Sequence, residues 1–593
     1  MENTLKQAYD VIVVGGGIGG ITAALSAARH GAKTALIHDR PMPGGNAGSE
    51  IRMHICGATC HGARKDSRET GILEEILLEN KKRNPNHVFP VFDTIMWKKL
   101  KFQDNLTLYL NTHMYDVCMD GERIQSITAK QLTTEKTFEF TGKIYIDCTG
   151  DGTLSYLAGA RCMTGREGRN VFGEKYAVPE SDSVTMGNSI LFAARDTGAP
   201  VSFTPPSYAH HYTEKDLMGH KEITSGYWWV EIGGTEWNTI TEAEEIRDEL
   251  LAIIYGIWDH IKNGGDHHAE NYDLTWIGFL PGKRESRRIV GDYVLKEQDL
   301  LEGKRFPDAV AYGGWNIDTH MPEKFLSIAK GEEQTEDISI KLEDVYTIPY
   351  RCLYSADIAN LMMGGRLIST SHRSFGSTRV MGTCASVSQA AGLAAALAAK
   401  DNLTPRQVGD RIGELQQQLL KDDCYIPGIL RQDPADLAPL AQIHSDLPED
   451  PLCRNVAFGY SRRVNGTDYA WESGHIPTKE HPAGLIFCWD KGMKISEIRL
   501  AFDSDLSAEI MPSLSDWAKD RQPEGVPKTI IKDFTIQGFY HGTSVFKVNV
   551  EGNYQRHRII RLDCAAVCDQ MEIKVFAANG EEPARIYEVR IYE

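Results

Sequence analysis

The hydrophobic and polar positions of this chain follow two different patterns. Near the start, the apolar run Val11–Val14 leads directly into glycines and then into a small-residue stretch, which predicts a buried strand, a tight turn and a helix. Toward the C-terminus apolar residues alternate with polar ones, as at Ile498, Leu500 and Phe502, a period of two that is typical of half-buried strands. The sequence therefore predicts an α/β part followed by an all-β part.

The first turn carries the spacing Gly15-x-Gly17-x-x-Gly20 between the predicted strand and helix. In such a unit the first glycine allows the tight turn, the second lets a pyrophosphate approach the backbone, and the third lets the helix pack on the strand. Asp39 follows the second apolar strand 24 residues after Gly15, near the roughly 20-residue spacing of a ribose-binding acid. His38 is the alternative to Asp39. The sequence therefore predicts a dinucleotide site.

Further glycine-rich blocks follow in order, and they carry a resemblance to a known family. They are Gly44–Asn46, Ile146–Gly152, Asn360–Arg366 and the more particular Ser371–Cys384. Together with the first turn they resemble the FAD-dependent oxidoreductases called FAD-oxidored, which have a glutathione-reductase-type FAD-binding fold, over about residues 8–400. The resemblance implies FAD as the dinucleotide. Because the sequence has no second strand–GxGxxG–helix unit, we expect electrons to come from a substrate or to pass to a separate acceptor.

The resemblance also implies which residues hold the cofactor. The expected FAD-binding residues are Gly15, Gly17, Gly20, Asp39, Gly45, Asn46, Arg52, Met114, Gly150, Asp151, Gly365, Arg366, Gly382 and Thr383. The backbone near Met114 is expected to touch the adenine. The final helix is expected to direct its N-terminus, at Gly382 and Thr383, toward the flavin edge where negative charge develops on reduction. For Gly382 alone, a plain helix start is an equal alternative.

With this resemblance, the expected fold is an α/β Rossmann-like FAD-binding domain with an inserted α+β substrate domain, followed by a jelly-roll-like β-sandwich. The sandwich loosely resembles galactose-binding-like or discoidin-type modules, which bind sugars or serve as structural and oligomer interfaces. The expected boundaries are 1–174 and 351–424 for the FAD-binding domain, 175–350 for the insertion, 425–454 for a proline-rich linker and 455–593 for the sandwich.

Composition narrows the class of protein. The 593 residues include 64 basic and 82 acidic side chains, and the net charge of −18 disfavours nucleic acid and anionic membranes as partners. The 12 cysteines lack paired spacing, as in reduced intracellular proteins. Met1–Tyr9 lacks the apolar core of a signal peptide. Because the apolar stretch Gln389–Ala399 is shorter than the about 20 residues that span a bilayer, we expect a cytoplasmic protein without a membrane partner.

The first cluster of titratable side chains comprises His54, Cys56, Cys60 and His61. Three interpretations compete: a metal site, a covalent flavin attachment, or polar lining of an active site in which one histidine acts as acid or base. Zinc usually takes ligands from separated pairs, whereas these four crowd into eight residues. We therefore expect no metal here, and polar lining is the favoured interpretation.

The second cluster supplies the preferred catalytic base. His372, in the block that the family places by the flavin, has the intrinsic pKa to accept a hydroxyl proton, with His54 and His61 as alternatives. Arg373 or Arg379 is expected to stabilise an anionic substrate or intermediate, with a structural ion pair as the alternative. One arginine of the charged block 282–288, with Arg284 as the choice, is expected to orient substrate or flavin, and a solvated charged turn is the alternative. Two adjacent tryptophans, Trp228–Trp229, would point to opposite faces of a strand, so one of them is available to stack on a ligand.

Three functions remain open from the sequence. The leading hypothesis is an FAD-dependent oxidoreductase that takes hydride from a hydroxylated small molecule, a sugar, glycoside or polyol, and delivers it to flavin N5. The first alternative is a flavin-dependent reductase of an unsaturated carboxylate, fed by a separate electron carrier and gripping the carboxylate with arginines. The second is a glycan-binding protein with a vestigial flavin site. A homo-oligomer formed through the sandwich is compatible with each.

Overall fold

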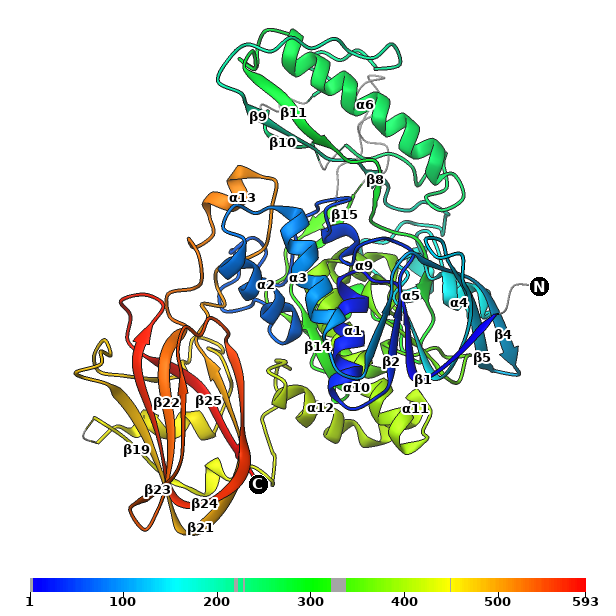
Figure 1. The fold of residues 1–593 in the computed structure, drawn as a ribbon. Coiled ribbons are helices and arrows are strands. Elements are labelled where there is room, and N and C mark those ends of the chain that lie inside the picture. Colours follow the sequence, from blue (N-terminus) through cyan, green and yellow to red (C-terminus); the bar gives the residue numbers. More distant parts are fainter. Residues whose placement is uncertain (1–3, 218–221, 228–229, 321–337, 448) are drawn as a thin grey trace. The chain divides into compact units, whose positions relative to one another are not determined.

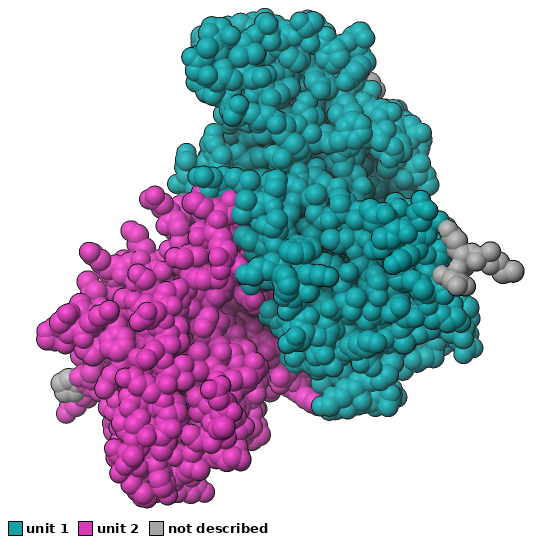
Figure 2. Space-filling model, in the orientation of Figure 1, with its two compact units in different colours: residues 1–60, 86–412, 511–521 teal, residues 61–85, 413–510, 522–593 magenta. Residues whose placement is uncertain are grey.

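The computed structural model describes residues 4–217, 222–227, 230–320, 338–447 and 449–593 (Figure 1). The predicted ligand-stacking pair Trp228–Trp229 lies outside the described residues. The chain forms two compact units, coloured separately in Figure 2. Unit 1 comprises residues 1–60, 86–412 and 511–521, and unit 2 comprises residues 61–85, 413–510 and 522–593. The finer division into five segments stays a prediction.

The main sheet of unit 1 is mostly parallel. In spatial order its strands are β3 (Leu106–Tyr109), β2 (Thr34–Ile37), β1 (Leu5–Val14), β6 (Thr137–Asp147), β5 (Arg123–Gln131) and β4 (Thr112–Asp120), with β18 (Leu361–Met363) also paired to β6. The first four strands and β18 run parallel, while β5 and β4 form an antiparallel extension. The run Val11–Val14 is buried on both faces, which is why it lacks alternation.

Helix α1 (Ile18–Arg29) follows β1 at once, as the sequence predicts, and packs closely on α10 (Met381–Asp401). A Cβ atom at Gly392 would lie 2.1 Å from the carbonyl oxygen of Ala23, so the contact requires a residue without a side chain. The expectation that the apolar helix is too short to span a bilayer is wrong, because the helix begins before Gln389 and runs for 21 residues. By length and composition it is apolar enough to cross a membrane, but 83% of the tested window is buried inside the protein, as in core helices of soluble proteins.

The described part of residues 175–350 forms small antiparallel ladders and one long helix. Figure 1 shows α6 (Ala243–Asn263) lying against the sheet β10 (Ser225–Gly226), β9 (Phe192–Asp196) and β11 (Tyr272–Ile277). Phe192, Tyr227 and Trp258 form the aromatic centre of their shared core. The other ladders pair β7 (Cys162–Met163) with β13 (Arg288–Ile289), β8 (Asn188–Ser189) with β12 (Gly282–Lys283), β14 (Ala309–Gly313) with β17 (Tyr346–Pro349), and β15 (Ile317–Thr319) with β16 (Ile338–Ile340).

Among the described residues of unit 1, the other helices are short, except for α3. They are α3 (Phe89–Lys101), α4 (Thr153–Leu157), α5 (Arg169–Phe172), α7 (Glu297–Leu301), α9 (His372–Thr378), α11 (Pro405–Val408) and α13 (Asp516–Asp520). Ser371 caps α9, because its hydroxyl accepts a hydrogen bond from the backbone of Ser374. This cap fixes the start of α9 and with it the position of His372.

Unit 2 is built on an antiparallel sheet, and it contains the predicted all-β C-terminal region. In spatial order the strands are β20 (Trp471–Glu472), β25 (Arg585–Tyr592), β21 (Ala483–Phe502), β24 (His557–Ala578), β22 (Ile531–Tyr540) and β23 (Thr543–Val550), and the helices are α2 (Ile72–Arg83) and α12 (Ile412–Lys421). Ile498, Leu500 and Phe502 are buried in its core, as the alternation predicts.

One strand of unit 2 lies inside the segment predicted as a linker. β19 (Gln442–Ser445) pairs with β21, placing Ile443 opposite Phe487, and Ile443 is buried in the same core. The prolines that suggested an extended connection flank this strand, so they do not interrupt its ladder. Residues 425–454 therefore contribute to the packed sheet as well as to the connection.

Candidate cofactor and active site

The turn after β1 has the geometry that the glycine motif predicts. Gly15 has φ +103°, and a Cβ there would lie 2.2 Å from the carbonyl oxygen of Cys148. A Cβ at Gly20 would lie 1.8 Å from the carbonyl oxygen of Gly15. At Gly17, which caps α1, the nearest atom to a Cβ would be the Cα of Gly45 at 3.9 Å. Gly15 and Gly20 thus hold the backbone together, while Gly17 leaves room next to the helix N-terminus.

Two neighbouring residues at the end of β2 have different environments. The backbone N–H of Gly16 donates to Nδ1 of His38 over 3.0 Å, and Nε2 of His38 lies 3.1 Å from the carbonyl oxygen of Met42. Burial lowers the pKa of His38, so the neutral ring is favoured. Asp39 is exposed. His38 is thus engaged in supporting the glycine turn, which leaves Asp39 as the better candidate for a ribose.

Several predicted FAD-binding residues meet in one polar cluster. Nε of Arg366 donates to the carbonyl oxygen of Gly150 over 2.9 Å, and Nη2 of Arg366 lies 3.3 Å from Oδ1 of Asp151. Lys283 holds the other carboxylate oxygen of Asp151 at 2.7 Å, and its carbonyl oxygen accepts from Nδ2 of Asn46 over 3.1 Å. Burial raises the pKa of Asp151, but Lys283 and Arg366 outweigh it, so the pKa lies below its usual value.

Two members of this region are not among the predicted site residues. Lys283 belongs to a charged block in which the sequence favours its neighbour Arg284. Asp147 ends β6 as a fully buried carboxylate that accepts hydrogen bonds from the backbone and hydroxyl groups of Thr149 and Ser155 at 2.7–3.0 Å. Its position directly after an apolar strand is the signal that could have identified it. It fixes the turn that carries Gly150.

Arg52 and Met114 lie apart from this cluster. The guanidinium of Arg52 lies 4.0 Å from the ring centre of Trp276, and its Nε donates to the carbonyl oxygen of Ser49 over 3.1 Å. The side chain of Met114, on β4, is buried in the core that includes Ile127. Contacts of these two residues with the cofactor stay predictions.

The surroundings of Gly365, Gly382 and Thr383 indicate whether FAD fits beside α10. A Cβ at Gly365, which has φ +65°, would meet no atom within 4 Å. The hydroxyl Oγ1 of Thr383 is buried and has no hydrogen-bond partner among the described residues. The backbone N–H of Gly382 donates to the carbonyl oxygen of Cys56 over 2.8 Å. Open space at Gly17 and Gly365, together with the orphaned hydroxyl of Thr383, fits the FAD that the sequence implies.

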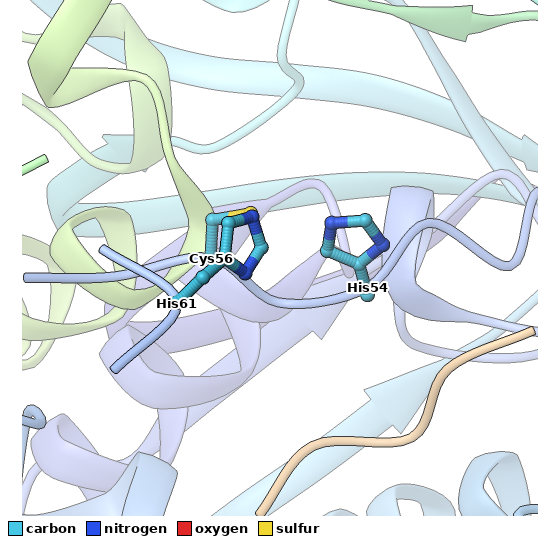
Figure 3. A group of neighbouring side chains, drawn as sticks. All are labelled: His54, Cys56 and His61. Atoms are coloured by element: carbon cyan, nitrogen blue, oxygen red, sulfur yellow. The ribbon is translucent and has the colours of Figure 1, made fainter. Parts of the chain in front are cut away.

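The loop that carries His54 and Cys56 is drawn in Figure 3. The two side chains belong to unit 1, and each offers a ligand atom within 4.8 Å of the other. His61, drawn in the same figure, belongs to the segment assigned to unit 2, where its Nδ1 lies 3.5 Å from Oε2 of Glu509. The expectations for this cluster, the absence of a metal included, stay predictions.

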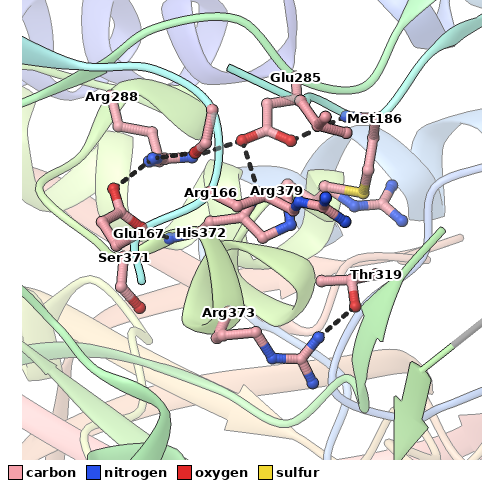
Figure 4. Close-up of polar contacts among 12 residues, drawn as sticks. Arg166, Glu167, Met186, Glu285, Arg288, Thr319, Ser371, His372, Arg373 and Arg379 are labelled. Atoms are coloured by element: carbon pink, nitrogen blue, oxygen red, sulfur yellow. Dashed lines mark hydrogen bonds and ion pairs between the residues drawn. The ribbon is translucent and has the colours of Figure 1, made fainter. Parts of the chain in front are cut away.

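His372, the preferred base, is bonded to a buried carboxylate. Its Nδ1 lies 3.0 Å from Oε1 of Glu285, and its backbone N–H donates to Oε2 of Glu167 over 2.8 Å (Figure 4). Arg288 forms ion pairs with both glutamates. Burial is the largest influence on Glu285 and opposes its ionisation, but His372 and Arg288 outweigh it, so the pKa of Glu285 lies below its usual value.

A pocket opens beside this pair. Its empty space, with the open solvent at its mouth included, amounts to about 430 Å³. It is lined by Arg166, Glu167, Tyr176, Ala177, Val178, Val184, Thr185, Thr319, His320, His372 and Arg373. Nε of Arg373 lies 3.2 Å from Oε2 of Glu297, and its Nη1 donates to Thr319 (Figure 4). Nη2 of Arg373 is buried and has no hydrogen-bond partner among the described residues. The pocket thus combines an oriented histidine with an incompletely satisfied arginine.

Arg284 is linked to the pocket residue His320 through Glu231. Its Nε lies 3.3 Å from Oε2 of Glu231, and the same oxygen lies 2.8 Å from Nδ1 of His320. Nε2 of His320 lies 3.1 Å from Oδ2 of Asp318. Burial opposes ionisation of Glu231, but Arg284 and His320 lower its pKa to about 2. Glu231, Glu285 and His320 were missed from sequence, since only folding brings them together.

Comparison with known proteins agrees with the resemblance that the glycine-rich blocks of the sequence carry. The family model for FAD dependent oxidoreductases matches residues 10–419, which is more than half of the chain. Among solved structures, the family 32 carbohydrate-binding module of Streptococcus pneumoniae EndoD is 17% identical, with 27% of this chain and 99% of that chain covered and a TM-score of 0.20. L-proline dehydrogenase from P. horikoshii is 21% identical, with 25% and 24% covered and a TM-score of 0.16.

These TM-scores are low, so no argument rests on the two structural likenesses. The family match is extensive, and it includes the glycine turn, the Asp151 and Arg366 cluster and His372. Members of this family depend on FAD, which agrees with the space and the orphaned hydroxyl found near α10. The chain belongs to the family of FAD-dependent oxidoreductases.

Proposed function

We propose that this enzyme oxidises a hydroxylated small molecule, of the class of sugars, glycosides and polyols, with His372 as the base that takes the hydroxyl proton. The observation that carries the proposal is the bond between His372 and the buried Glu285 in the wall of a pocket. When bound, FAD supplies the acceptor for the hydride that leaves the carbon of the substrate. The roles of the side chains follow from their contacts.

The contact with Glu285 decides which nitrogen of His372 is available. A carboxylate only accepts hydrogen bonds, so the Nδ1 atom of His372 carries the proton that it donates to Glu285. In the neutral ring with this tautomer the lone pair is on Nε2, which is then the atom that accepts a hydroxyl proton. Glu285 stabilises the imidazolium formed in this step without being protonated, as the carboxylate of a Ser-His-Asp triad does. Glu285 is therefore a positioning residue and His372 the catalytic one.

The lining of the pocket supports a substrate with several hydroxyl groups. Arg166, Thr185 and Thr319 provide hydrogen-bonding groups, and Tyr176 adds an aromatic side chain. Pockets of this kind use a few polar groups to orient a ligand against an apolar surface. A ring that carries hydroxyl groups on its edge and C–H groups on its face matches both kinds of contact.

One observation favours a second candidate, a reductase of an unsaturated carboxylate fed by a separate electron carrier. Nη2 of Arg373 is buried at the pocket without a hydrogen-bond partner among the described residues. A buried guanidinium N–H that lacks a partner is costly, and a carboxylate is the acceptor that arginine binds best. Arg166 lines the same pocket, although it already pairs with Asp182 at 2.5 Å.

Visible spectra of the flavin under anaerobic conditions test the proposal. The purified enzyme is mixed with panels of sugars, glycosides, polyols and hydroxy acids, and separately the chemically reduced enzyme is mixed with unsaturated carboxylates. Bleaching by a sugar or polyol is the expected result. Reoxidation by an unsaturated carboxylate, with no bleaching by any alcohol, would favour the reductase and overturn the proposal.

The proposal also includes the electron acceptor, the localisation of the enzyme and the role of the C-terminal all-β region. A separate electron acceptor is expected, because the sequence holds one dinucleotide-binding motif of this kind. The net charge of −18 and the scattered cysteines favour a cytoplasmic protein. The C-terminal all-β region then serves as a structural or homo-oligomer interface or as a second contact for a carbohydrate.

A further inference from the structure

Four side chains outside the pocket converge at one end of α6. They are Glu214, His260, Asp266 and His267, and each offers one nitrogen or oxygen such that all four atoms lie within 4.8 Å of one another. His260 is in the last turn of α6, Asp266 and His267 follow it, and Glu214 comes from a turn that precedes α6 by almost thirty residues. We propose that these four residues form a binding site for a divalent transition-metal ion of the zinc type.

The distances between the four groups fit a tetrahedral ion. Oε2 of Glu214 lies 3.1 Å from Nε2 of His260 and 3.0 Å from Nε2 of His267. Oδ1 of Asp266 lies 3.5 Å from the same atom of His260 and 3.8 Å from that of His267. Bonds of about 2.0–2.1 Å to a tetrahedral zinc ion separate two ligand atoms by roughly 3.3 Å. The four distances lie around this value.

The chemistry of the donors also fits. Imidazole nitrogens with carboxylate oxygens are ligands that zinc accepts, and imidazole favours transition metals over calcium and magnesium. Two neutral histidines and two carboxylates give the site a charge of about −2, which a divalent ion would balance. The side chain of His267 is fully buried and that of His260 is nearly so, whereas Glu214 and Asp266 are partly exposed and leave a path for the ion.

The surrounding structure holds the ligands before any ion binds. Tyr212 and Leu217, on either side of the Glu214 turn, are buried in the core beneath α6. The backbone N–H of Thr213 donates to Asp216 over 2.7 Å, which closes that turn. Preorganised ligands lose little conformational entropy on binding.

The loop after α6 is anchored in the same way. Nζ of Lys262 donates to the carbonyl oxygens of Ala269, Glu270 and Tyr272 at 2.7–2.9 Å. Four protein ligands leave no open position, as in structural zinc sites. The ion would thus fasten the Glu214 turn to the end of α6 and to the following loop, and it would take no part in the redox reaction.

The test measures bound metal and stability, so it does not depend on the substrate or on turnover. The FAD-loaded enzyme is incubated with Zn²⁺, freed of excess by gel filtration and analysed for zinc by mass spectrometry. We compare it with His267→Gln and His260→Gln, and with the matched control His268→Gln, because His268 is exposed next to the cluster. The wild type and His268→Gln should hold one equivalent of zinc more than the other two variants, and Zn²⁺ should raise their Tm.

Glu214→Gln guards against misfolding of the histidine variants, because it keeps the shape of the side chain and removes only its charge. It should lose the same equivalent of zinc while its circular dichroism and FAD content match the wild type. Equal zinc content in all five proteins, or a wild type that holds no zinc above background, would overturn the proposal. In that case the cluster is a hydrogen-bonded network in which both imidazoles donate to Glu214.

Discussion

The Nδ1 atom of His372 lies 3.0 Å from Oε1 of Glu285, although 87 residues separate the two along the chain. Glu285 is fully buried and is also paired with Arg288, so its negative charge is fixed beside the imidazole. This contact orients the imidazole of His372, which we propose as the base. Loss of the Glu285 charge would therefore leave His372 and Arg288 without this buried partner.

Replacing Glu285 by glutamine should destabilise the protein. The change leaves the guanidinium of Arg288 without one of its two counter-charges in a buried environment. Breaking a buried ion pair on one side costs about 3–5 kcal/mol, whereas the exposed Glu302→Gln should change the free energy of unfolding by less than about 0.5 kcal/mol. Urea titrations of the two variants measure this difference, and equal midpoints would contradict the role given to Glu285.

A methyl group at Gly20 should abolish stable FAD binding. The Cβ of Gly20→Ala would lie 1.8 Å from the carbonyl oxygen of Gly15, so β1 and α1 must move apart and the turn between them must change. Gly413→Ala is the control, since a Cβ there meets no atom within 4 Å. The flavin absorbance that remains after gel filtration is the measurement. Gly20→Ala protein with a full complement of FAD would show that the close approach is not required.

Arg366→Lys should weaken FAD binding by at least about tenfold, because lysine does not reproduce the planar fork that joins Gly150, Asp151 and the Lys283 carbonyl. Arg161→Lys is the matched control. Arg161 pairs with Asp357 at the surface, where such pairs contribute about 0–1 kcal/mol. Titration of the apoprotein with FAD gives both affinities, and an unchanged affinity in Arg366→Lys would remove this cluster from the cofactor site.

His320 should make the stability of the protein depend on pH. Burial opposes its charge and is the largest influence, but Glu231 and Asp318 outweigh it, so the pKa of His320 is raised. A group with a raised pKa in the folded state contributes its full stability below its unfolded pKa, about 6.5 for histidine, and that stability is lost as the pH rises through the folded value. The Tm should therefore fall as the pH rises above about 6.5.

The decline of the Tm with rising pH should be smaller in His320→Gln, because glutamine does not titrate. His268→Gln should keep the wild-type slope, because that residue is exposed. Thermal melts of the three proteins across this pH range separate the cases. Parallel curves for wild type and His320→Gln would contradict the raised pKa.

The local elements of this fold could be predicted from sequence because their signals are local. The strand, turn and helix around Gly15 need only neighbouring residues, and the alternation at Ile498 and Leu500 reports one buried face. The helix α10 begins at Met381, within two residues of the N-terminus expected at Gly382 and Thr383, whereas the apolar stretch Gln389–Ala399 covers only its second half. The strand β19 was hidden among prolines that lie outside its ladder.

The candidate site was only partly predictable, since its partners are remote along the chain. His372 could be chosen for its residue type and its motif, but nothing near it in sequence identifies Glu285 or Glu167 as its partners. Arg284 was chosen within a charged block, and the fold instead directs it to Glu231. Which side chain of such a block reaches the pocket depends on the face of the short strand or turn that meets it. Tertiary packing decides that face.

The most direct test of the account is the rate of flavin reduction in His372→Gln, measured by anaerobic stopped flow with the sugar or polyol that bleaches the wild type. Loss of a general base lowers a rate by about 10²–10⁴-fold, and we predict a decrease of this size with the FAD content unchanged. His268→Gln serves as the control and should reduce its flavin at the wild-type rate. A His372→Gln enzyme that is reduced as fast as the wild type would contradict the assignment of His372 as the base.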